Sequence, residues 1–546
     1  MSRSQGSSTH PVPVVIVGAG PVGVTAATLL GQYGVDCLVL DRWDCVYPQP
    51  RAVHLDDEIY RVLVRLGIAE QFAAMSRPTR GLQLIDRNHR VLAAFDRAGE
   101  NGRHGHPRAN MFDQPELEHL MRTNLKDQTT VTLRGNAEVT DVAQDGHGRV
   151  RVDFTDRLTG EHESVLATYV LGCDGANSVV RTSIGATMED LQFEQRWLLI
   201  DVASKVELDQ WEGVHQVCDP DRAATYMRIG DTRYRWEFRL LEGETAADFE
   251  SIEALQPLIG PWVEGIPCDQ LELVRVAEYT FRAQLADRWR DRNVFLLGDA
   301  AHLTPPFVGQ GLCAGVRDSM NLSWKLAGVL CGDLPESVLD TYEEERRPHA
   351  RALIRLAKLI GVSMTQGGRA GDLLRRLLAP RLHWVPGLRD RLLDGETPPL
   401  SRSALVMRPG RRRSLAGKLC PNALLTDGSR YDDVTRGGFV FVTDVPLSPQ
   451  QRALLADRGT KVLEVRPGSR LYDWLSDGRA TAALVRPDFT VMRAGRDVAA
   501  LCEAMPRFRV APEGDGRQVS GSYGPARCSP WRDVGEELDG RPQRRH

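Results

Sequence analysis

The sequence predicts an α/β protein: a parallel sheet with crossover helices, interleaved with an antiparallel sheet and followed by a smaller α/β domain. Three patterns carry this prediction. Residues 12–35 run from an apolar strand through a glycine-rich turn into a helix, without a charged residue. Residues 187–285 alternate apolar and polar side chains, as antiparallel strands do. Beyond residue 405, short apolar strands again alternate with helical segments.

Size and composition limit the class of protein. A chain of 546 residues is too long for one ordinary domain. Its net charge of −4, with 26% charged residues, offers no electrostatic case for binding nucleic acid or an anionic membrane. The ten cysteines include no CxxC pair and no Cys/His cluster at metal spacing, so we expect a reduced, cytoplasmic protein without a metal site. Residues 12–35 could span a bilayer by length, but their grouped glycines and prolines favour a soluble strand and helix.

The first motif is G-x-G-x-x-G in "VVIVGAGPVGVTAATLL", at Gly18, Gly20 and Gly23. These glycines allow a tight turn, a close approach of backbone to a pyrophosphate, and close packing of the helix on the strand. The next strand, "DCLVLD", ends at Asp41, whose carboxylate can accept from both ribose hydroxyls, and Arg42 follows as a further candidate. The pattern predicts a Rossmann-type dinucleotide site. By itself it does not decide whether the ligand is NAD or FAD, or whether the glycine-rich turn binds no ligand.

Two later segments repeat the strand–turn–helix pattern. "ATYVLGCDGANSVVRTSIG" and "NVFLLGDAAHLTPPFVGQGLCAG" both bring a strand to an aspartate, and the second adds two prolines and a Gly-Gln-Gly turn. Three contact segments favour a fixed flavin over an exchanging nicotinamide. Alternatively, Asp299 only caps a helix, which leaves the prolines and glycines unexplained. The cofactor-binding candidates in these segments are Asp174, Asp299, Pro305, Gly309, Gly311 and Leu312.

Together the three segments resemble the fingerprints of FAD-dependent aromatic hydroxylases, the single-component group that includes para-hydroxybenzoate and phenol hydroxylases. The resemblance extends from residue 12 to about residue 400. Three further stretches, "DRWDCVYPQPRAVHLDDEIYRVLVRLG", "NMFDQPELEHLM" and "GQGLCAGVRDSMNLSWKL", are similar to 3-(3-hydroxyphenyl)propionate and 3-hydroxycinnamate hydroxylases. This resemblance implies that Arg51 lies beside the flavin and that Gln114 contacts the cofactor near its ribityl chain. Cys313, where polyketide hydroxylases carry asparagine, favours the same branch.

The resemblance also implies an organisation into domains. An FAD-binding domain is interrupted by a substrate-binding sheet, and a thioredoxin-like domain without CxxC follows, for which a structural or oligomerising role is expected. A homodimer is one expected state. The predicted ranges are 12–186 and 286–400 for the FAD-binding domain, 187–285 for the substrate sheet, 405–511 for the thioredoxin-like domain, and 1–11 and 512–546 for disordered tails.

In this family NADH or NADPH reduces the FAD, dioxygen forms a flavin C4a-hydroperoxide, and an oxygen atom passes to a phenol, here expected ortho to its hydroxyl. Ionising a phenol with a pKa near 10 costs about 4 kcal/mol at pH 7, so the site needs a proton acceptor. His54, which follows "PRAV", is the catalytic candidate. The candidates on the substrate sheet, each also common in protein cores, are His215, Tyr226, Tyr234 and Trp236.

Two other functions share these motifs. A polyketide or antibiotic hydroxylase would have the same cofactor segments and a larger pocket. A non-catalytic flavin-binding protein would hold FAD without substrate-stimulated oxidation of NAD(P)H. The sequence leaves open the choice of NADH or NADPH, the substrate, the position hydroxylated and the oligomeric state.

Overall fold

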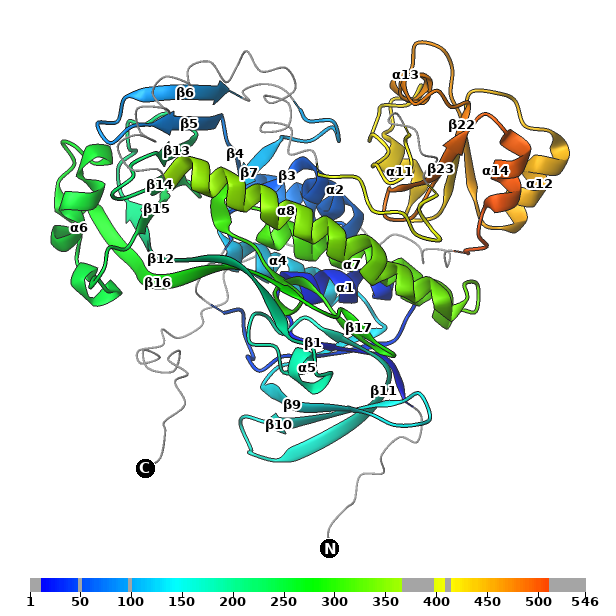
Figure 1. Ribbon diagram of the computed structural model, residues 1–546, viewed down its shortest axis with the longest axis horizontal. Helices are drawn as coiled ribbons and strands as arrows, with labels where there is room; N and C mark the ends of the chain where they lie inside the picture. The colour runs from blue at the N-terminus through cyan, green and yellow to red at the C-terminus, as the bar shows by residue number, and fades with distance from the viewer. Residues whose placement is uncertain (1–10, 48–51, 97–100, 366–396, 408–413, 510–546) are drawn as a thin grey trace, which may run out of the picture. The chain divides into compact units, whose positions relative to one another are not determined.

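The computed structural model describes residues 11–47, 52–96, 101–365, 397–407 and 414–509. Arg51 and, apart from Pro11, the two expected tails lie outside these ranges. The strands of the described ranges form two eight-stranded sheets, a four-stranded sheet and a three-stranded sheet (Figure 1).

The first eight-stranded sheet is the Rossmann-type sheet. Its central strands follow the order β18-β11-β1-β2-β8 and all run parallel, and β9, β10 and β17 pair antiparallel at its margins. Strand β1 is buried over its last four residues because helices cover the sheet, as in other parallel sheets. The strands are β1 (Val12–Val17), β2 (Cys37–Leu40), β8 (Val131–Arg134), β9 (Ala137–Gln144), β10 (Val150–Asp156), β11 (His162–Gly172), β17 (Arg290–Asp291) and β18 (Val294–Leu296).

The helices of this region pack on one another as well as on the sheet. Helix α1 packs against α7, and α7 packs against α8 (Figure 1). Helix α7 is buried over most of its length, including several charged side chains, so it forms part of the core and not a solvated face. The helices are α1 (Pro21–Gln32), α2 (Asp57–Leu66), α3 (Ala69–Met75), α4 (Gln114–Leu125), α5 (Val179–Ser183), α7 (Gly311–Leu330) and α8 (Thr341–Thr365).

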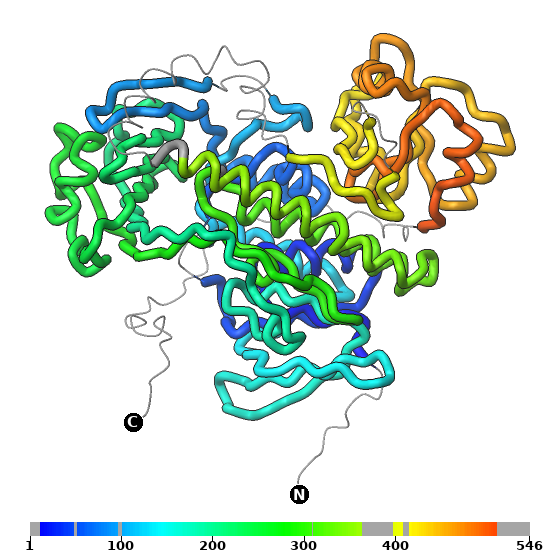
Figure 2. Tube along the Cα trace, in the orientation of Figure 1, coloured from blue at the N-terminus to red at the C-terminus, as the bar shows by residue number. Residues whose placement is uncertain are grey.

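The second eight-stranded sheet is mostly antiparallel, with the order β19-β16-β12-β15-β14-β13-β5-β6. The long strands β12 and β16 pair along their length, and Figure 2 traces the chain leaving the parallel sheet along β12 and returning along β16. Strands β5 and β6 join because β5 pairs parallel with β13, so the sheet also uses a segment that precedes residue 187. Its elements are β5 (Gly81–Ile85), β6 (Val91–Asp96), β12 (Met188–Ser204), β13 (Val214–Val217), β14 (Ala224–Arg228), β15 (Arg233–Arg239), α6 (Ile252–Ile259), β16 (Leu271–Ala286) and β19 (His302–Leu303).

A three-stranded sheet, β3-β7-β4, connects the two larger ones in sequence. Its strand β3 carries His54 and leads directly into α2, whose first turn is capped by the Asp56 carboxylate accepting from the Ile59 amide at 2.9 Å. The strands are β3 (His54–Asp56), β4 (Arg77–Pro78) and β7 (Ala109–Met111).

The C-terminal segment forms the four-stranded sheet β21-β20-β22-β23, with β20 and β21 parallel and the others antiparallel. This strand order, with one helix between the two parallel strands, one between β21 and β22 and one after β23, is the thioredoxin-like arrangement. Its elements are α11 (Tyr431–Thr435), β20 (Val440–Thr443), α12 (Pro449–Asp457), β21 (Lys461–Glu464), α13 (Arg470–Asp477), β22 (Ala482–Val485), β23 (Val491–Gly495) and α14 (Val498–Ala504).

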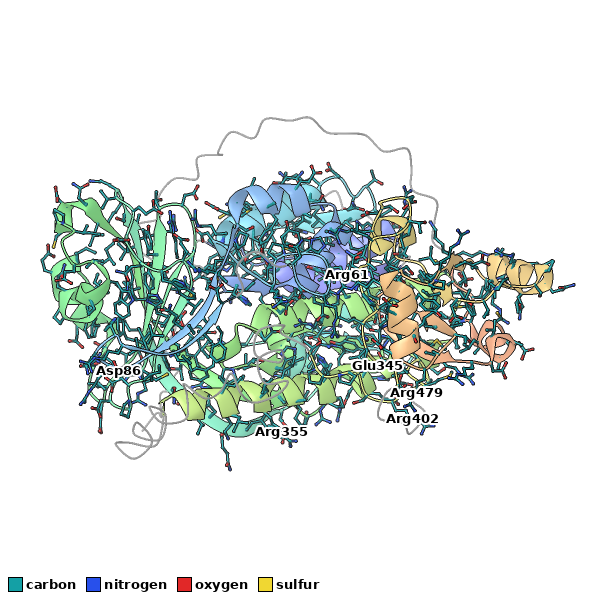
Figure 3. The ribbon with its side chains drawn as sticks, turned by 90° about the horizontal axis from the view of Figure 1, so that it is seen from above. Arg61, Asp86, Glu345, Arg355, Arg402 and Arg479 are labelled. Carbon is teal, nitrogen blue, oxygen red and sulfur yellow. The ribbon has the colours of Figure 1, made fainter. Side chains whose placement is uncertain are left out.

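Two buried ion pairs join this segment to the helices before it. Arg61 of α2 donates to Asp432 through Nε at 2.5 Å and Nη2 at 2.6 Å. Arg486 donates to Glu345 of α8 at 2.8 and 2.9 Å. Arg61 and Glu345 are labelled in Figure 3. A buried arginine is stable only with such a partner, so these contacts hold the C-terminal sheet against α2 and α8.

Among the helices that the structure describes, none combines the length and the hydropathy needed to cross a membrane.

Candidate cofactor and substrate site

Three turns meet at one edge of the parallel sheet. Gly172, the last residue of β11, pairs with Val17 at the end of β1 and with Leu296 at the end of β18. Each strand then continues into one of the three segments singled out from the sequence. Because ligands of such sheets bind at the carboxyl ends of the strands, this edge is the candidate cofactor site.

The three motif glycines of the first turn meet different surroundings. Gly18 has φ +99°, and a Cβ there would collide with the carbonyl oxygen of Cys173, in the second turn. A Cβ on Gly23 would collide with the carbonyl oxygen of Gly18. A Cβ on Gly20 would meet nothing within 4 Å. Gly18 and Gly23 therefore allow close packing, while Gly20 leaves open space at the start of α1, where amide groups and the helix dipole favour a phosphate.

Asp41 ties the first turn to the end of β2. Its carboxylate accepts from the amide of Ala19 at 2.6 Å and from the amide of Trp43 at 2.8 Å, and Arg122 Nη2 lies 3.6 Å from it. Arg42 is exposed, and its guanidinium lies 5.6 Å from the centre of the Trp43 ring. The acid predicted to hold a ribose is thus fixed at the sheet edge by backbone donors.

The second turn supports the third. Asp174 accepts from the Ser178 hydroxyl at 2.5 Å and from the Val180 amide at 3.1 Å, so its carboxylate holds the N-cap and the first turn of α5. Burial raises the pKa of Asp174, against the opposing effect of these hydrogen bonds. Arg181 donates to the carbonyl oxygen of Ala300 at 3.0 Å, which joins the second turn to the third. The sequence-predicted role of Asp174 is therefore accompanied by a structural one.

Asp318, and not Asp299, holds the third turn in place. The Asp318 carboxylate accepts from the Gly298 amide at 3.0 Å and from Arg346 Nε at 2.8 Å, and His302 Nε2 lies 2.8 Å from it. Across the residues that the structure describes, no hydrogen bond or ion pair involves the half-buried Asp299 carboxylate, and it caps no helix. The structure therefore does not support the alternative that Asp299 only caps a helix, and its carboxylate can accept from a cofactor hydroxyl. The role of Asp318 had no signal in the sequence.

The turn from Pro305 to the start of α7 brings the cofactor edge to His54. Gly309 has φ +60°, and a Cβ there would come 2.8 Å from Nδ1 of His54. Gly311 is the first residue of α7, and a Cβ on it would meet nothing within 4 Å. Leu312 packs against the core behind this open helix start. His54 therefore lies against the Gly309 turn, which is part of a predicted cofactor-binding segment.

A buried charge network holds strand β3 to the start of α7. Arg317 donates to Asp56 Oδ2 at 2.5 Å and to Gln310 Oε1 at 2.8 Å, and Gln310 donates to Asp56 at 3.0 Å. Burial favours a raised pKa at Asp56, but Arg317 outweighs it and holds this pKa below its usual value. These three residues were missed from the sequence, since an arginine inside a helix gives no sign of its partner. They fix the distance between His54 and the Gly309 turn.

Gln114 holds the segment that precedes His54. Its buried side chain accepts from the Ala52 amide at 2.5 Å and donates to Glu118 at 2.6 Å. Arg51, predicted to lie beside the flavin, is adjacent to Ala52 and lies outside the described residues. The observed contacts of Gln114 position the chain around residue 52, beside the cofactor edge.

The four residues that the sequence suggested for substrate binding lie on the face of the antiparallel sheet that packs against α6, away from the cofactor edge. The four residues are His215, Tyr226, Tyr234 and Trp236, and they pack against Leu255 and Ile259 of α6 and against Trp262, which follows this helix. Trp262 Nε1 also donates to His215 Nδ1 at 3.1 Å. A location inside this core counts against a contact between these side chains and substrate.

The opposite face of the sheet meets the cofactor side. Val53 and Met111, next to and across from His54, pack on Met227. Phe307, between Pro305 and Gly309, packs on Trp197 with ring centres 6.0 Å apart. Side chains of a strand alternate between the two faces of a sheet. The residues next in sequence to Tyr226, Tyr234 and Trp236 therefore face the cofactor edge.

These features fit FAD. An open glycine at a helix start suits a pyrophosphate, and the start of α7 offers amides to the flavin ring. Asp299, which has no hydrogen bond within the described ranges, offers an acceptor for a sugar-alcohol hydroxyl. In the part of the chain that the structure describes, no group of three or more histidine, cysteine or acidic residues could hold a metal ion.

Comparison with known proteins agrees. The model of the FAD binding domain family matches residues 11–357, so the chain belongs to this family. The chain is 33% identical over 526 residues to a probable NADH-specific resorcinol 4-hydroxylase of Rhodococcus jostii, covering 92% of this chain and 95% of that protein. It is 34% identical to a 3-(3-hydroxy-phenyl)propionate/3-hydroxycinnamic acid hydroxylase of Burkholderia vietnamiensis, covering 83% and 84%.

Among solved structures, the flavin-dependent monooxygenase PieE in complex with FAD and substrate is similar, with a TM-score of 0.76 at 25% identity, covering 91% of this chain and 99% of that one. The family, the relatives and the fold confirm the predicted FAD cofactor and the predicted class, a flavin-dependent aromatic hydroxylase.

Proposed function

We propose that this enzyme hydroxylates a phenol ortho to its hydroxyl group, using NADH or NADPH and dioxygen. The observation that carries the proposal is the position of His54. It lies against the Gly309 turn of the cofactor edge, and its neighbour Val53 packs on the substrate sheet. A phenol between that sheet and the flavin would have an imidazole at its side.

When bound, FAD accepts a hydride from NAD(P)H and activates dioxygen, which supplies one oxygen atom to the ring and the other to water. The net reaction consumes one phenol, one NAD(P)H, one proton and one dioxygen, and it forms one catechol, one NAD(P)⁺ and one water. This chain's residues bind, orient and deprotonate the phenol, and they exclude water.

The proton of the phenol is assigned to His54. A phenolate carries more electron density at its ortho carbons, but forming it from a free phenol costs about 4 kcal/mol at pH 7. A half-buried imidazole can accept or share that proton, which lowers this cost. Its strand is held by the Asp56–Arg317–Gln310 network, so the ring stays in place as substrate enters and leaves.

Exclusion of water is assigned to an apolar wall. Val53 and Met111 pack on Met227 and Ile229, and Phe307 packs on Trp197 at the other side of the turn. Water in this space would divert oxygen transfer into release of hydrogen peroxide.

The cofactor is proposed to be held without a covalent bond, by the amides at Gly20 and Gly311 and by Asp299. A hydrogen bond to a charged group is worth about 1.5–3 kcal/mol, so Asp299→Ala should raise the dissociation constant for FAD by at least tenfold. Titration of apo-enzyme with FAD measures this. An unchanged constant would remove Asp299 from the cofactor site, and flavin retained in an acid-precipitated pellet would contradict non-covalent binding.

The substrate proposed from the sequence motifs is 3-(3-hydroxyphenyl)propionate or its cinnamate analogue, and relatives named for that activity support this choice. A resorcinol-type phenol is the second candidate, since the relative named for resorcinol hydroxylation matches over 92% of this chain.

One assay tests the function. With each phenol, the nicotinamide consumed, the catechol formed and the peroxide formed are measured together. Equal amounts of nicotinamide and catechol are expected, and His54→Ala should lower catechol relative to peroxide or slow hydroxylation. His147→Ala, at an exposed site in another part of the chain, is the control. If peroxide is the only product, the compound is an effector and not a substrate. If the enzyme does not respond to simple phenols but turns over a multi-ring phenol, a polyketide substrate is favoured.

A further inference from the structure

Glu237 lies near the centre of the sheet face that meets the cofactor side. It is on the strand β15, between Leu199 of β12 and Thr225 of β14 in the register of the sheet. Its sequence neighbours Trp236 and Phe238 point the other way, into the core against α6. Alternation along the strand therefore directs Glu237 away from α6.

The neighbours of Leu199, Glu237 and Thr225 connect Glu237 to the candidate active site. Leu199, beside Glu237, belongs to the same hydrophobic cluster as Trp197. Phe307, which lies between Pro305 and Gly309, packs against this cluster. On the other side, Met227, two residues along β14 from Thr225, packs on Val53 beside His54. Glu237 thus lies between the two contacts that join the sheet to the candidate active site.

Two cations that the structure describes on this sheet, Arg235 and Arg275, already have partners. Arg235 donates to Asp201 through Nε at 2.6 Å and Nη2 at 2.8 Å, and both side chains are buried. Arg275, which pairs with Asp201 in the register of β12 and β16, also has interactions of its own. By contrast, no hydrogen bond or ion pair within the described ranges involves the carboxylate of Glu237, although its residue is only 8% exposed.

A buried acid without a partner is unfavourable unless a ligand supplies a donor. Burial raises the pKa of Glu237, and the neighbouring Arg235 opposes that rise only in part. Either form of the acid can accept a hydrogen bond from a hydroxyl group. A substrate carboxylate in the same place would meet the acids Glu237 and Asp201 and would find Arg235 already engaged.

We propose that Glu237 accepts a hydrogen bond from a second hydroxyl of the substrate, and so selects uncharged phenols of the resorcinol type over phenols that carry a carboxylate. This inference rests on the proposed function, and it names the substrate class of the same site. It favours the second candidate substrate over the first.

The test measures binding to the FAD holoenzyme from the change in flavin absorbance, with three probes. Resorcinol has the second hydroxyl, 3-methoxyphenol has that hydroxyl blocked, and 3-(3-hydroxyphenyl)propionate has a carboxylate. Wild-type enzyme should bind resorcinol about tenfold or more tighter than 3-methoxyphenol. In Glu237→Leu this ratio should fall to about twofold or less, since the acceptor is gone. In Glu237→Gln the propionate should bind about fivefold or more tighter than in wild type, since a negative charge is gone.

Glu272→Gln is the matched control, because Glu272 is an exposed carboxylate on the same sheet and should change neither ratio. If Glu237→Leu fails to retain FAD, the Glu237→Gln comparison decides alone. Tighter binding of the propionate than of resorcinol by wild-type enzyme would overturn the inference, as would ratios unchanged by both substitutions. Failure of the proposed function is a separate result, namely no catechol from any probe that binds.

Discussion

The two faces of the antiparallel sheet are both buried, but they are built from different chemistry. The face against α6 is an aromatic core in which Tyr226, Trp236 and Trp262 pack together. The face toward the cofactor carries the Asp201–Arg235 pair and Glu237 among apolar side chains. The first face stabilises the sheet through removal of apolar area from water, and the second places polar groups where a ligand can meet them.

This difference shows that burial alone does not mark a substrate pocket. The aromatic side chains are the larger and more conspicuous ones, yet they pack on one another and on α6. The polar side chains opposite them are retained at an energetic cost, since burying charge is unfavourable without a partner. The predictions below separate a stabilising face from a ligand-binding face.

The largest effect is expected from breaking the buried ion pair. Asp201→Ala leaves the Arg235 guanidinium buried without its bidentate partner, which should lower the free energy of unfolding by about 3–5 kcal/mol. Guanidinium denaturation of the FAD holoenzyme, followed by tryptophan fluorescence, measures the loss. The double variant Asp201→Leu, Arg235→Met should lose less than the sum of its two single changes. Strict additivity would show that the pair contributes no interaction.

Trp236→Ala tests the aromatic face. Its side chain is fully buried, and removing it should lower the free energy of unfolding by about 3–4 kcal/mol through lost contacts and a cavity. At a temperature where the variant is folded, its preference between resorcinol and 3-(3-hydroxyphenyl)propionate should equal that of wild-type enzyme. A changed preference would place Trp236 in the pocket and contradict the assignment of faces.

The cofactor edge was predictable because its signals are local. The glycine-rich turn comes after β1, Asp41 after β2 and Asp299 after β18, and parallel strands end at a common edge. The face of the substrate sheet was not predictable in this way. Along β15 the sequence alternates apolar and charged side chains, but residues 234–238 are all buried, so the pattern does not show which face meets a ligand.

Long-range partners were equally invisible. The joining of β5 to β13 and the networks around Asp318 and Arg317 depend on residues far apart in the chain. Helix α7 is buried almost all round, so its charged residues resemble a solvated face in sequence while they hold the cofactor turns in the structure.

A smaller effect is expected from the histidine on the aromatic face. Burial lowers the pKa of His215 to about 4, below its ordinary value near 6.5, so the folded state binds fewer protons than the unfolded state. Its contribution to stability is fully present above about pH 6.5 and declines as the pH falls toward 4, with about 2 kcal/mol lost at pH 5.

His215→Gln should therefore narrow the difference in unfolding free energy between pH 7 and pH 5 by about 2 kcal/mol, while glutamine can still accept from Trp262. Other buried histidines contribute equally to both proteins, so only the change in the difference is interpreted. His147→Gln, at an exposed position, should leave the difference unaltered. If His215→Gln and His147→Gln lose the same unfolding free energy between pH 7 and pH 5, the role of His215 is contradicted.

The smallest effect is expected from removing the hydroxyl groups of Tyr226 and Tyr234, two tyrosines of the aromatic face. The Tyr234 hydroxyl accepts from the buried Leu208 amide at 3.3 Å, whereas no hydrogen bond in the described part of the chain involves the Tyr226 hydroxyl. Tyr234→Phe should lower the free energy of unfolding by about 1 kcal/mol, and Tyr226→Phe by less, because only the first removes a hydrogen bond. Both variants should keep kcat/KM for the preferred phenol within about twofold of wild type, since neither hydroxyl is directed to the cofactor side. Steady-state assays on enzyme of equal FAD content measure this, and a tenfold or larger rise in KM for either variant would return that tyrosine to the substrate pocket and reverse the assignment of the two faces.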